Sequence, residues 1–187
     1  MFRKSLSVIV LAIVVCSACC GCESNLPKTR IDEEAVTFFD QASLELFAGK
    51  WDSTIVDTVF ESTRNGGDFE FCVSGDHLQF TFKDENTPVA ASGTVYLLLV
   101  DDKKYAYVRG NVISVDGRWL PFESFCRYEF GGGTIKFCAI SKGVVVRLLA
   151  DERESGDVQL SELLYAMNAS HDRLFLNLSS YVKLKRK

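Results

Sequence analysis

Histidine is scarce in this chain of 187 residues, which contains only His77 and His171. Each histidine has an aspartate next to it, in a stretch that we expect to be a turn before a strand. Neither is close in sequence to a cluster of cysteines, and a zinc site needs four ligands held on a rigid fold. We therefore expect no metal and no other cofactor.

Motifs of known enzyme classes are also missing. Ser124 lies in the sequence PFESFC, which lacks the Gly-x-Ser-x-Gly pattern that exposes a catalytic serine. Glycines 131–133 join two expected strands, and no helix follows them to bind a phosphate. We therefore expect a protein without enzymatic activity.

The chain has no excess of positive charge, because its formal net charge is −4 at pH 7. Loss of a segment that contains Arg3 and Lys4 would change this charge to −6. Nucleic-acid binding depends on neutralising phosphates with lysine and arginine, so a nucleic acid is not an expected partner. The one basic cluster is Lys183–Lys187, and we expect it to be solvated.

Proline and methionine are rare, with three and two copies, whereas phenylalanine occurs 14 times. Together with a hydrophobic content of 47%, this composition is typical of a well-packed globular body. A chain of this length can bury the core of one domain, but not comfortably of two. We expect a single domain over residues 31–187.

The N-terminal segment has the features of a signal peptide. Arg3 and Lys4 give it a positive start, and an uncharged apolar run follows from Ser5 to Val15. A membrane-spanning helix needs about 20 apolar residues, and this run ends in small residues rather than in a basic flank. We therefore expect a signal peptide over residues 1–18 and an exported protein.

Four of the seven cysteines lie between Cys16 and Cys22, directly after the apolar run. This segment resembles bacterial lipoprotein signals, in which a small residue precedes the cysteine that receives diacylglycerol. Cys19 is the preferred attachment site, because it follows the small pair Ser17-Ala18 close to the end of the run. Cys22 is the alternative, since it follows Gly21 and precedes a more usual Glu-Ser pair.

The lipoprotein resemblance implies an anchor in the cell membrane or the outer membrane, with the body in the periplasm or at the surface. Residues 19–30 would form a lipidated tether that includes Pro27. Each buried acyl methylene contributes about 0.8 kcal/mol to such an anchor. The membrane is therefore an expected partner through the acyl chains alone.

Two segments have the apolar spacing of a helix. The first covers residues 31–47, with acidic residues near its start and Gly49 after its end. The second covers residues 157–168, where leucines and a methionine recur at helical spacing. We expect an N-terminal helix and a short helix before the last strands.

The sequence after Gly49 alternates between apolar and polar residues, with turn signals every 8–12 residues. This pattern is typical of an antiparallel β-barrel or sandwich. We therefore expect a mainly β domain. The expected strands include residues 68–74, 77–83, 94–100, 105–115, 118–124, 125–130, 134–138, 144–150, 173–179 and 181–187.

The hairpin around Gly132 suggests a disulfide. If the pairing is centred on this glycine, Cys126 lies opposite Cys138, with Cβ atoms about 4.5–5.5 Å apart. An exported protein meets an oxidising compartment. We therefore expect a Cys126–Cys138 disulfide, which leaves Cys72 as a buried or half-buried thiol.

Short motifs in the β region resemble the lipocalin family. Gly49 and Trp51 form a Gly-x-Trp motif at the entry to the first strand, Gly75–Phe80 is a turn-strand unit, and Tyr181–Arg186 resembles a final strand. The resemblance implies a barrel whose closed end packs the motif tryptophan against a late basic residue, Lys185 or Arg186. The other interpretation of the pattern is a different antiparallel barrel or sandwich.

A barrel without a catalytic constellation is expected to act as a binding module for a small hydrophobic ligand or a partner protein. The alternative is an envelope scaffold or interaction protein whose barrel core is solid. Phenylalanine side chains fill a small barrel as readily as they line a cavity, so composition does not separate the two functions.

The Cys19→Ala variant is expected to lose acyl labelling, because the diacylglycerol would have no thiol to modify. Intact mass spectrometry of the membrane-extracted protein after acyl labelling measures this loss. Cys22→Ala is the matched control and should keep its label. Unchanged labelling of Cys19→Ala, with loss in Cys22→Ala, would move the anchor to Cys22.

Overall fold

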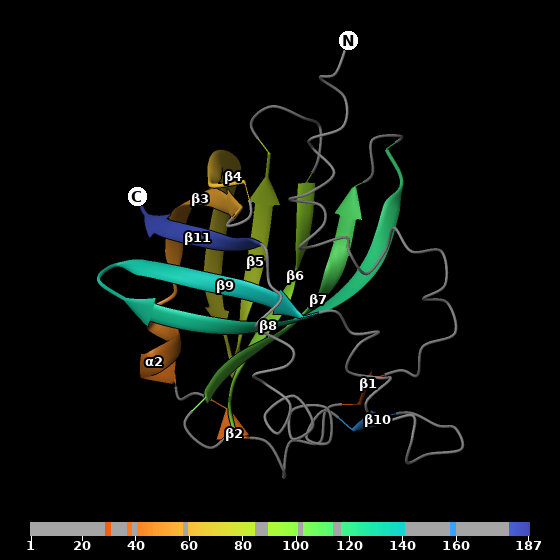
Figure 1. Ribbon diagram of the computed structural model, residues 1–187. Helices are drawn as coiled ribbons and strands as arrows, with labels where there is room; N and C mark the ends of the chain where they lie inside the picture. The colour runs from red at the N-terminus through yellow and green to blue at the C-terminus, as the bar shows by residue number, and fades with distance from the viewer. Residues whose placement is uncertain are drawn as a thin grey trace, which may run out of the picture.

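The structure is a computed structural model that describes residues 29–30, 37–38, 41–57, 60–84, 90–100, 103–113, 117–140, 158–159 and 180–187. Within these residues, eight antiparallel strands close into a β-barrel (Figure 1). In chain order they are β3 (Gly49–Asp57), β4 (Ser62–Ser74), β5 (His77–Lys83), β6 (Ala90–Val100), β7 (Lys103–Ile113), β8 (Trp119–Gly131), β9 (Thr134–Ile140) and β11 (Ser180–Arg186).

The strands follow one another around the barrel in an up-and-down order. Each strand from β3 to β9 pairs with the next one along the chain, and β11 lies between β9 and β3 (Figure 1). Val182 of β11 is paired with Phe137 of β9 on one side and with Ile55 of β3 on the other. These two ladders close the ring, so the expected antiparallel β-barrel is confirmed.

Alternation along each strand separates the interior of the barrel from its outer surface. On β5, Leu78, Phe80 and Phe82 are buried, whereas Gln79 and Thr81 between them are exposed. This is the period of two that a strand with one buried face requires. The buried residues of the core are Leu44, Phe47, Trp51, Ile55, Phe71, Leu78, Phe80, Phe82, Ala91, Val95, Leu97, Ala106, Val112, Phe122, Cys126, Tyr128, Ile135, Val182 and Leu184.

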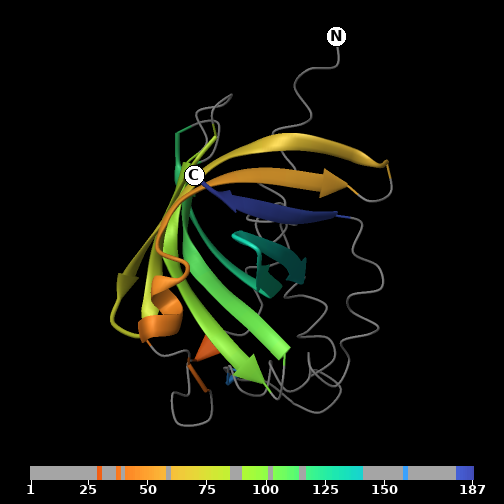
Figure 2. The same cartoon turned by 90° about the vertical axis from the view of Figure 1, so that its left-hand side faces the viewer.

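A short helix, α2 (Gln41–Glu45), lies at one end of the barrel (Figures 1 and 2). Leu44 and Phe47, in and just after this helix, belong to the buried core. The ring of Phe47 lies 5.6 Å from that of Tyr128 and 5.1 Å from that of Phe130, both on β8. These side chains plug this end of the barrel.

Trp51 is fully buried at the plugged end, two residues after Gly49 begins β3. Its indole Nε1–H donates a hydrogen bond to the carbonyl oxygen of Phe47, at 2.8 Å. The guanidinium carbon of Arg186 lies 4.9 Å from the centroid of the indole ring, within the range of a cation–π interaction. Arg186, and not Lys185, is therefore the late basic residue that contacts the tryptophan.

Arg186 also fixes the chain that leads into β3. Its guanidinium donates hydrogen bonds to the carbonyl oxygens of Leu46, at 2.6 Å, and of Ala48, at 3.1 Å. Lys187, which follows β11, adds ion pairs to two neighbouring strands. Its Nζ lies 2.9 Å from Asp52 of β3 and 2.8 Å from Asp68 of β4. Because the side chains of Lys187, Asp52 and Asp68 are accessible to solvent, solvent weakens these ion pairs.

The N-terminal helix expected over residues 31–47 is wrong at residues 37–38 and is shorter than expected at its end, while residues 31–36 and 39–40 lie outside the described residues. Thr37–Phe38 forms strand β2, which pairs with Leu98 and Leu99 of β6, and helix α2 covers only Gln41–Glu45. Strand β2 forms because β6 is longer than β5. Strand β5 pairs with β6 only as far as Val95, so the rest of β6 has a free edge. Strand β2 supplies hydrogen-bond partners to backbone groups of β6 beyond that point.

Two residues of the second expected helix, Val158–Gln159, form strand β10, which pairs in parallel with strand β1, Thr29–Arg30. The helix prediction is therefore wrong at these two residues, and Thr29–Arg30 is a strand at the end of the expected tether. Other predictions fall outside the described residues. They are the signal peptide, the anchor cysteines, the rest of the second helix, and the strands over 144–150 and 173–179.

Replacing Arg186 with alanine is expected to lower the free energy of unfolding by roughly 1–3 kcal/mol, because two charged hydrogen bonds and a cation–π contact are lost. Urea unfolding followed by tryptophan fluorescence measures this change. Lys185→Ala is the matched control, since its side chain is exposed on the same strand, and we expect less than about 0.5 kcal/mol. Equal effects of the two variants would contradict a special role for Arg186.

Candidate functional site

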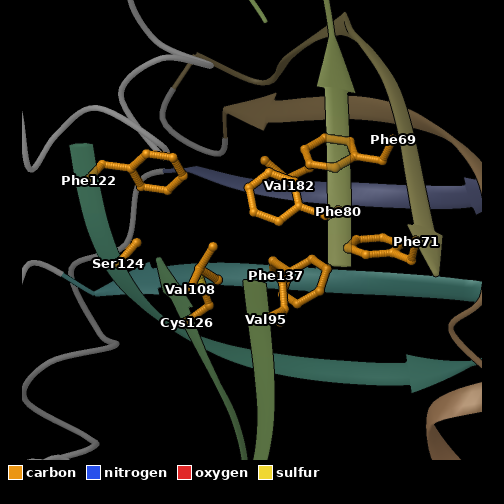
Figure 3. A pocket seen from close by; sticks show the side chains of 10 residues that line it. All are labelled: Phe69, Phe71, Phe80, Val95, Val108, Phe122, Ser124, Cys126, Phe137 and Val182. Atoms are coloured by element: carbon orange, nitrogen blue, oxygen red, sulfur yellow. The ribbon is translucent and has the colours of Figure 1, made fainter. Parts of the chain in front are cut away.

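A cavity of about 60 Å³ lies inside the barrel. Seven of the eight barrel strands contribute side chains to it, and Figure 3 shows these side chains projecting from the surrounding strands toward a common space. The lining residues are Phe69, Phe71, Phe80, Val95, Val108, Phe122, Ser124, Cys126, Phe137 and Val182. The cavity is therefore a property of the closed barrel and not of one loop.

The cavity begins where the plug at the α2 end stops. Phe122, Ser124 and Cys126 line it along β8, and the next residue on the same face of that strand is Tyr128. Tyr128 packs against Phe47 of the plug. The Trp51 end of the barrel is thus filled with side chains, and the empty volume lies beyond it.

Aromatic rings form much of the cavity wall. Phe69 lies 5.9 Å from Phe71 and 4.7 Å from Phe82, measured between ring centroids. Phe80 and Phe122 meet edge to face at 6.4 Å, although they belong to β5 and β8. These two rings approach each other across the inner surfaces of β6 and β7, which lie between their strands.

A pair of glycines explains this approach. Along one row of the barrel, Phe80 is paired with Gly93, Gly93 with Gly110, and Gly110 with Phe122. A Cβ atom on Gly93 would lie 2.2 Å from the carbonyl oxygen of Arg109, and one on Gly110 would lie 2.2 Å from that of Ser92. Strands β6 and β7 are therefore too close here for any side chain, and the phenylalanine rings extend over the two glycines.

Among the described residues that line the cavity, Ser124 and Cys126 alone have side chains with a polar hydrogen, and both are buried. Burial raises the pKa of the Cys126 thiol to about 12, although a hydrogen bond with Ser124 acts in the opposite direction. The thiol is therefore protonated at neutral pH, and a protonated thiol is a poor nucleophile. Cys126 is therefore not activated as a nucleophile in this cavity.

His77 does not reach the cavity, because it lies on the outer face of β5. Its Nδ1 atom is 2.9 Å from Asp76 Oδ1, and its Nε2 atom is 3.2 Å from the side-chain nitrogen of Gln79. His171 lies outside the described residues. Among the described residues, no three histidine, cysteine or acidic side chains are grouped so as to hold a metal ion.

The outer wall of the barrel carries an aromatic series that the sequence analysis missed. Ring centroids of His77, Tyr96, Tyr107 and Phe125, from β5 to β8, are separated by 5.4, 6.1 and 5.0 Å in turn. Tyr107 and Phe125 have no exposed area, although they face away from the core. For Tyr96 on β6 the sequence signal was the unbroken apolar run in TVYLLLV, since strands buried on both faces do not alternate.

The expected disulfide is wrong, because the register differs by one residue from the one we assumed. The turn consists of Gly132 and Gly133, whose φ angles are 57° and 69°, as a two-residue type I′ hairpin requires. Cys126 is therefore paired with Ala139, and Cys138 with Arg127. A shift of one residue places the two thiols on opposite faces, and both are free.

Cys72 is exposed on β4 and is a free thiol, which corrects the expectation of a buried or half-buried residue. It occupies an outward position between Phe71 and Val73. The alternation that placed these two neighbours in the interior thus also places Cys72 in solvent.

Within the described part of the chain, no helix has the length and apolar character needed to span a membrane. Comparisons with protein-family models, with curated proteins and with solved structures found no match to this chain.

In the folded protein, Cys126 is expected to react with iodoacetamide at pH 8 at least about tenfold more slowly than Cys72, because it is buried and its pKa is raised. Mass spectrometry of proteolytic peptides locates the label. In urea, where burial is lost, the two cysteines should react at similar rates. Recovery of a Cys126–Cys138 linked peptide without oxidant would contradict the free thiols.

Proposed function

We propose that this chain is a membrane-anchored envelope lipoprotein whose barrel binds a small apolar ligand without catalysing a reaction. The cavity inside the closed barrel is the observation that carries this proposal. Eight of its ten lining side chains are hydrocarbon, contributed by phenylalanine and valine. A site of this kind stabilises an apolar ligand by about 25 cal/mol for each Å² removed from water.

The size of the cavity limits the ligand. Eight-stranded barrels have an interior that side chains just fill or that holds one small molecule. The volume of about 60 Å³ is smaller than the roughly 150 Å³ of an engineered cavity that binds benzene. The ligand therefore has only a few non-hydrogen atoms, unless the rings of Phe80 and Phe122 move apart.

A lipocalin-like barrel is the finer proposal for the fold. Its support is the arrangement at the plugged end, where Gly49 begins β3, Trp51 is buried, and Arg186 lies over the indole ring. The up-and-down order of the eight strands agrees with it as well.

The proposed location depends on the N-terminal sequence. The short apolar run and the small residue before Cys19, or before Cys22 as the alternative, support export and attachment to the cell membrane or the outer membrane. The acyl chains would carry the membrane contact, so the barrel is free to bind a ligand away from the lipid.

The binding proposal predicts that n-pentane causes saturable chemical-shift changes at cavity residues in ¹H–¹⁵N NMR spectra. Val108→Phe should weaken this binding more than tenfold, because the larger ring would occupy the cavity, while circular dichroism checks that the variant folds. Thr81→Phe is the control, since it adds the same ring on the outer face of β5. If pentane and benzene both leave the spectrum of the unmodified protein unchanged, the scaffold function with a solid core replaces binding.

A further inference from the structure

Strands β9 and β11 carry a basic outer face, although the formal net charge of the chain is −4. The two strands lie side by side at the front of the barrel in Figure 1, and neither contains an acidic residue. Val182 and Leu184 of β11 point inward and are buried. Lys183 and Lys185, which alternate with them, are exposed on the outer wall, and Lys136 of β9 lies on the same wall. These three lysines form the basic face.

Two of the three lysines are direct neighbours across the sheet. Lys183 of β11 is paired with Lys136 of β9, and residues directly opposite each other have Cβ atoms about 4.5–5.5 Å apart. Like charges in this position repel each other. An anion in contact with both ammonium groups would remove the repulsion, so the basic face favours negatively charged partners.

Acidic residues on the adjoining strands compensate the basic face only in part. The Oε2 atom of Glu129 on β8 lies 3.8 Å from the Nζ atom of Lys136, and both side chains are accessible to solvent, which weakens the pair. Asp52 of β3 lies opposite Lys185 in the ladder, but its carboxylate also binds Lys187, at 2.9 Å. The basic face therefore keeps a net positive charge.

The surroundings of Lys183 suit an extended partner. Its neighbour on β3 is the uncharged Thr54, and Lys183 forms no ion pair within the part of the chain that the structure describes. Tyr181 precedes it on the same strand, with the Nζ atom of Lys136 4.5 Å from the ring centroid. Tyrosine is enriched where proteins meet the membrane–water interface. Because the lysines project from the outer wall, an anionic surface can contact all of them at once.

We infer that the basic face binds the head groups of anionic phospholipids. This inference rests on the proposed attachment to a membrane, and it is independent of ligand binding in the cavity. Lysines are attracted to an anionic bilayer within about one Debye length, roughly 8–10 Å, and the acyl anchor would hold the barrel near the bilayer. The contact involves the outer wall alone, so the cavity inside the barrel stays away from the lipid.

Lysine acetylation of the acylated full chain, reconstituted in vesicles, tests the inference. One set of vesicles contains phosphatidylcholine alone, and the other contains an equal mixture with the anionic phosphatidylglycerol. We expect Lys136, Lys183 and Lys185 to react at least about threefold more slowly in the mixed vesicles, because the head groups shield them. Lys83, which is exposed on β5, is the internal control and should react at similar rates in both. In 1 M NaCl, where the Debye length is about 3 Å, the difference should vanish.

A variant without two of the charges, Lys136→Gln with Lys183→Gln, tests whether this face of the barrel causes the effect. Both side chains are on the outer wall, and circular dichroism checks that the variant folds. In the variant, Lys185 should react at the same rate in both sets of vesicles. Lys83→Gln is the matched control and should keep the slower reaction of Lys185 in the mixed vesicles.

Flotation of the vesicles separates this inference from the proposed anchor. If the protein floats with both sets and the three lysines react equally fast in both, the inference is overturned and the anchor stands. An equal slowing by inorganic phosphate without vesicles would assign the face to a small anion and also overturn it. Flotation with the mixed vesicles alone, lost in the double variant, would support the basic face and overturn the acyl anchor, whereas flotation with neither set would overturn both.

Discussion

Strand β11 forms hydrogen bonds with β9 on one side and with β3 on the other, and this double pairing joins the two ends of the barrel. A closed ring has no free strand edges, and it creates an interior that no single hairpin could have. Arg186, at the end of β11, connects this closure to the core, because it lies over Trp51 and binds the carbonyl groups before β3. The plug and the cavity both lie inside the ring that this double pairing closes.

The sequence predicted the parts of the fold that local patterns control. Phe69 and Phe71 on β4 alternate with polar residues, as do the three apolar residues of β5, so these strands and the mainly β class were predictable. Strand β2 was not, because residues 37–38 become a strand only by pairing with the part of β6 that extends beyond β5. The free edge of β6 results from the different lengths of β5 and β6, which are distant in sequence. It therefore leaves no signal near residue 37.

The candidate site was less predictable than the fold. The turn at Gly132-Gly133 was recognised, but centring it on one glycine rather than between two placed the two cysteines on the same face, whereas they lie on opposite faces. The contact between Phe80 and Phe122 in the cavity wall requires Gly93 and Gly110 to meet on the two strands between them. Register across four strands decides that arrangement, and composition cannot show whether 14 phenylalanines fill a space or surround it.

The buried rings on the outer wall make the packing of the barrel uneven around its circumference. Tyr107 and Phe125 are packed on the outside of β7 and β8, while Ala106 and Cys126 beside them are packed on the inside, so this wall is held between two close-packed layers. The outer face of β5 is in contact with water at Gln79 and Thr81. The two walls of the barrel therefore differ in packing, since β7 and β8 carry buried side chains on both faces and β5 on its inner face only.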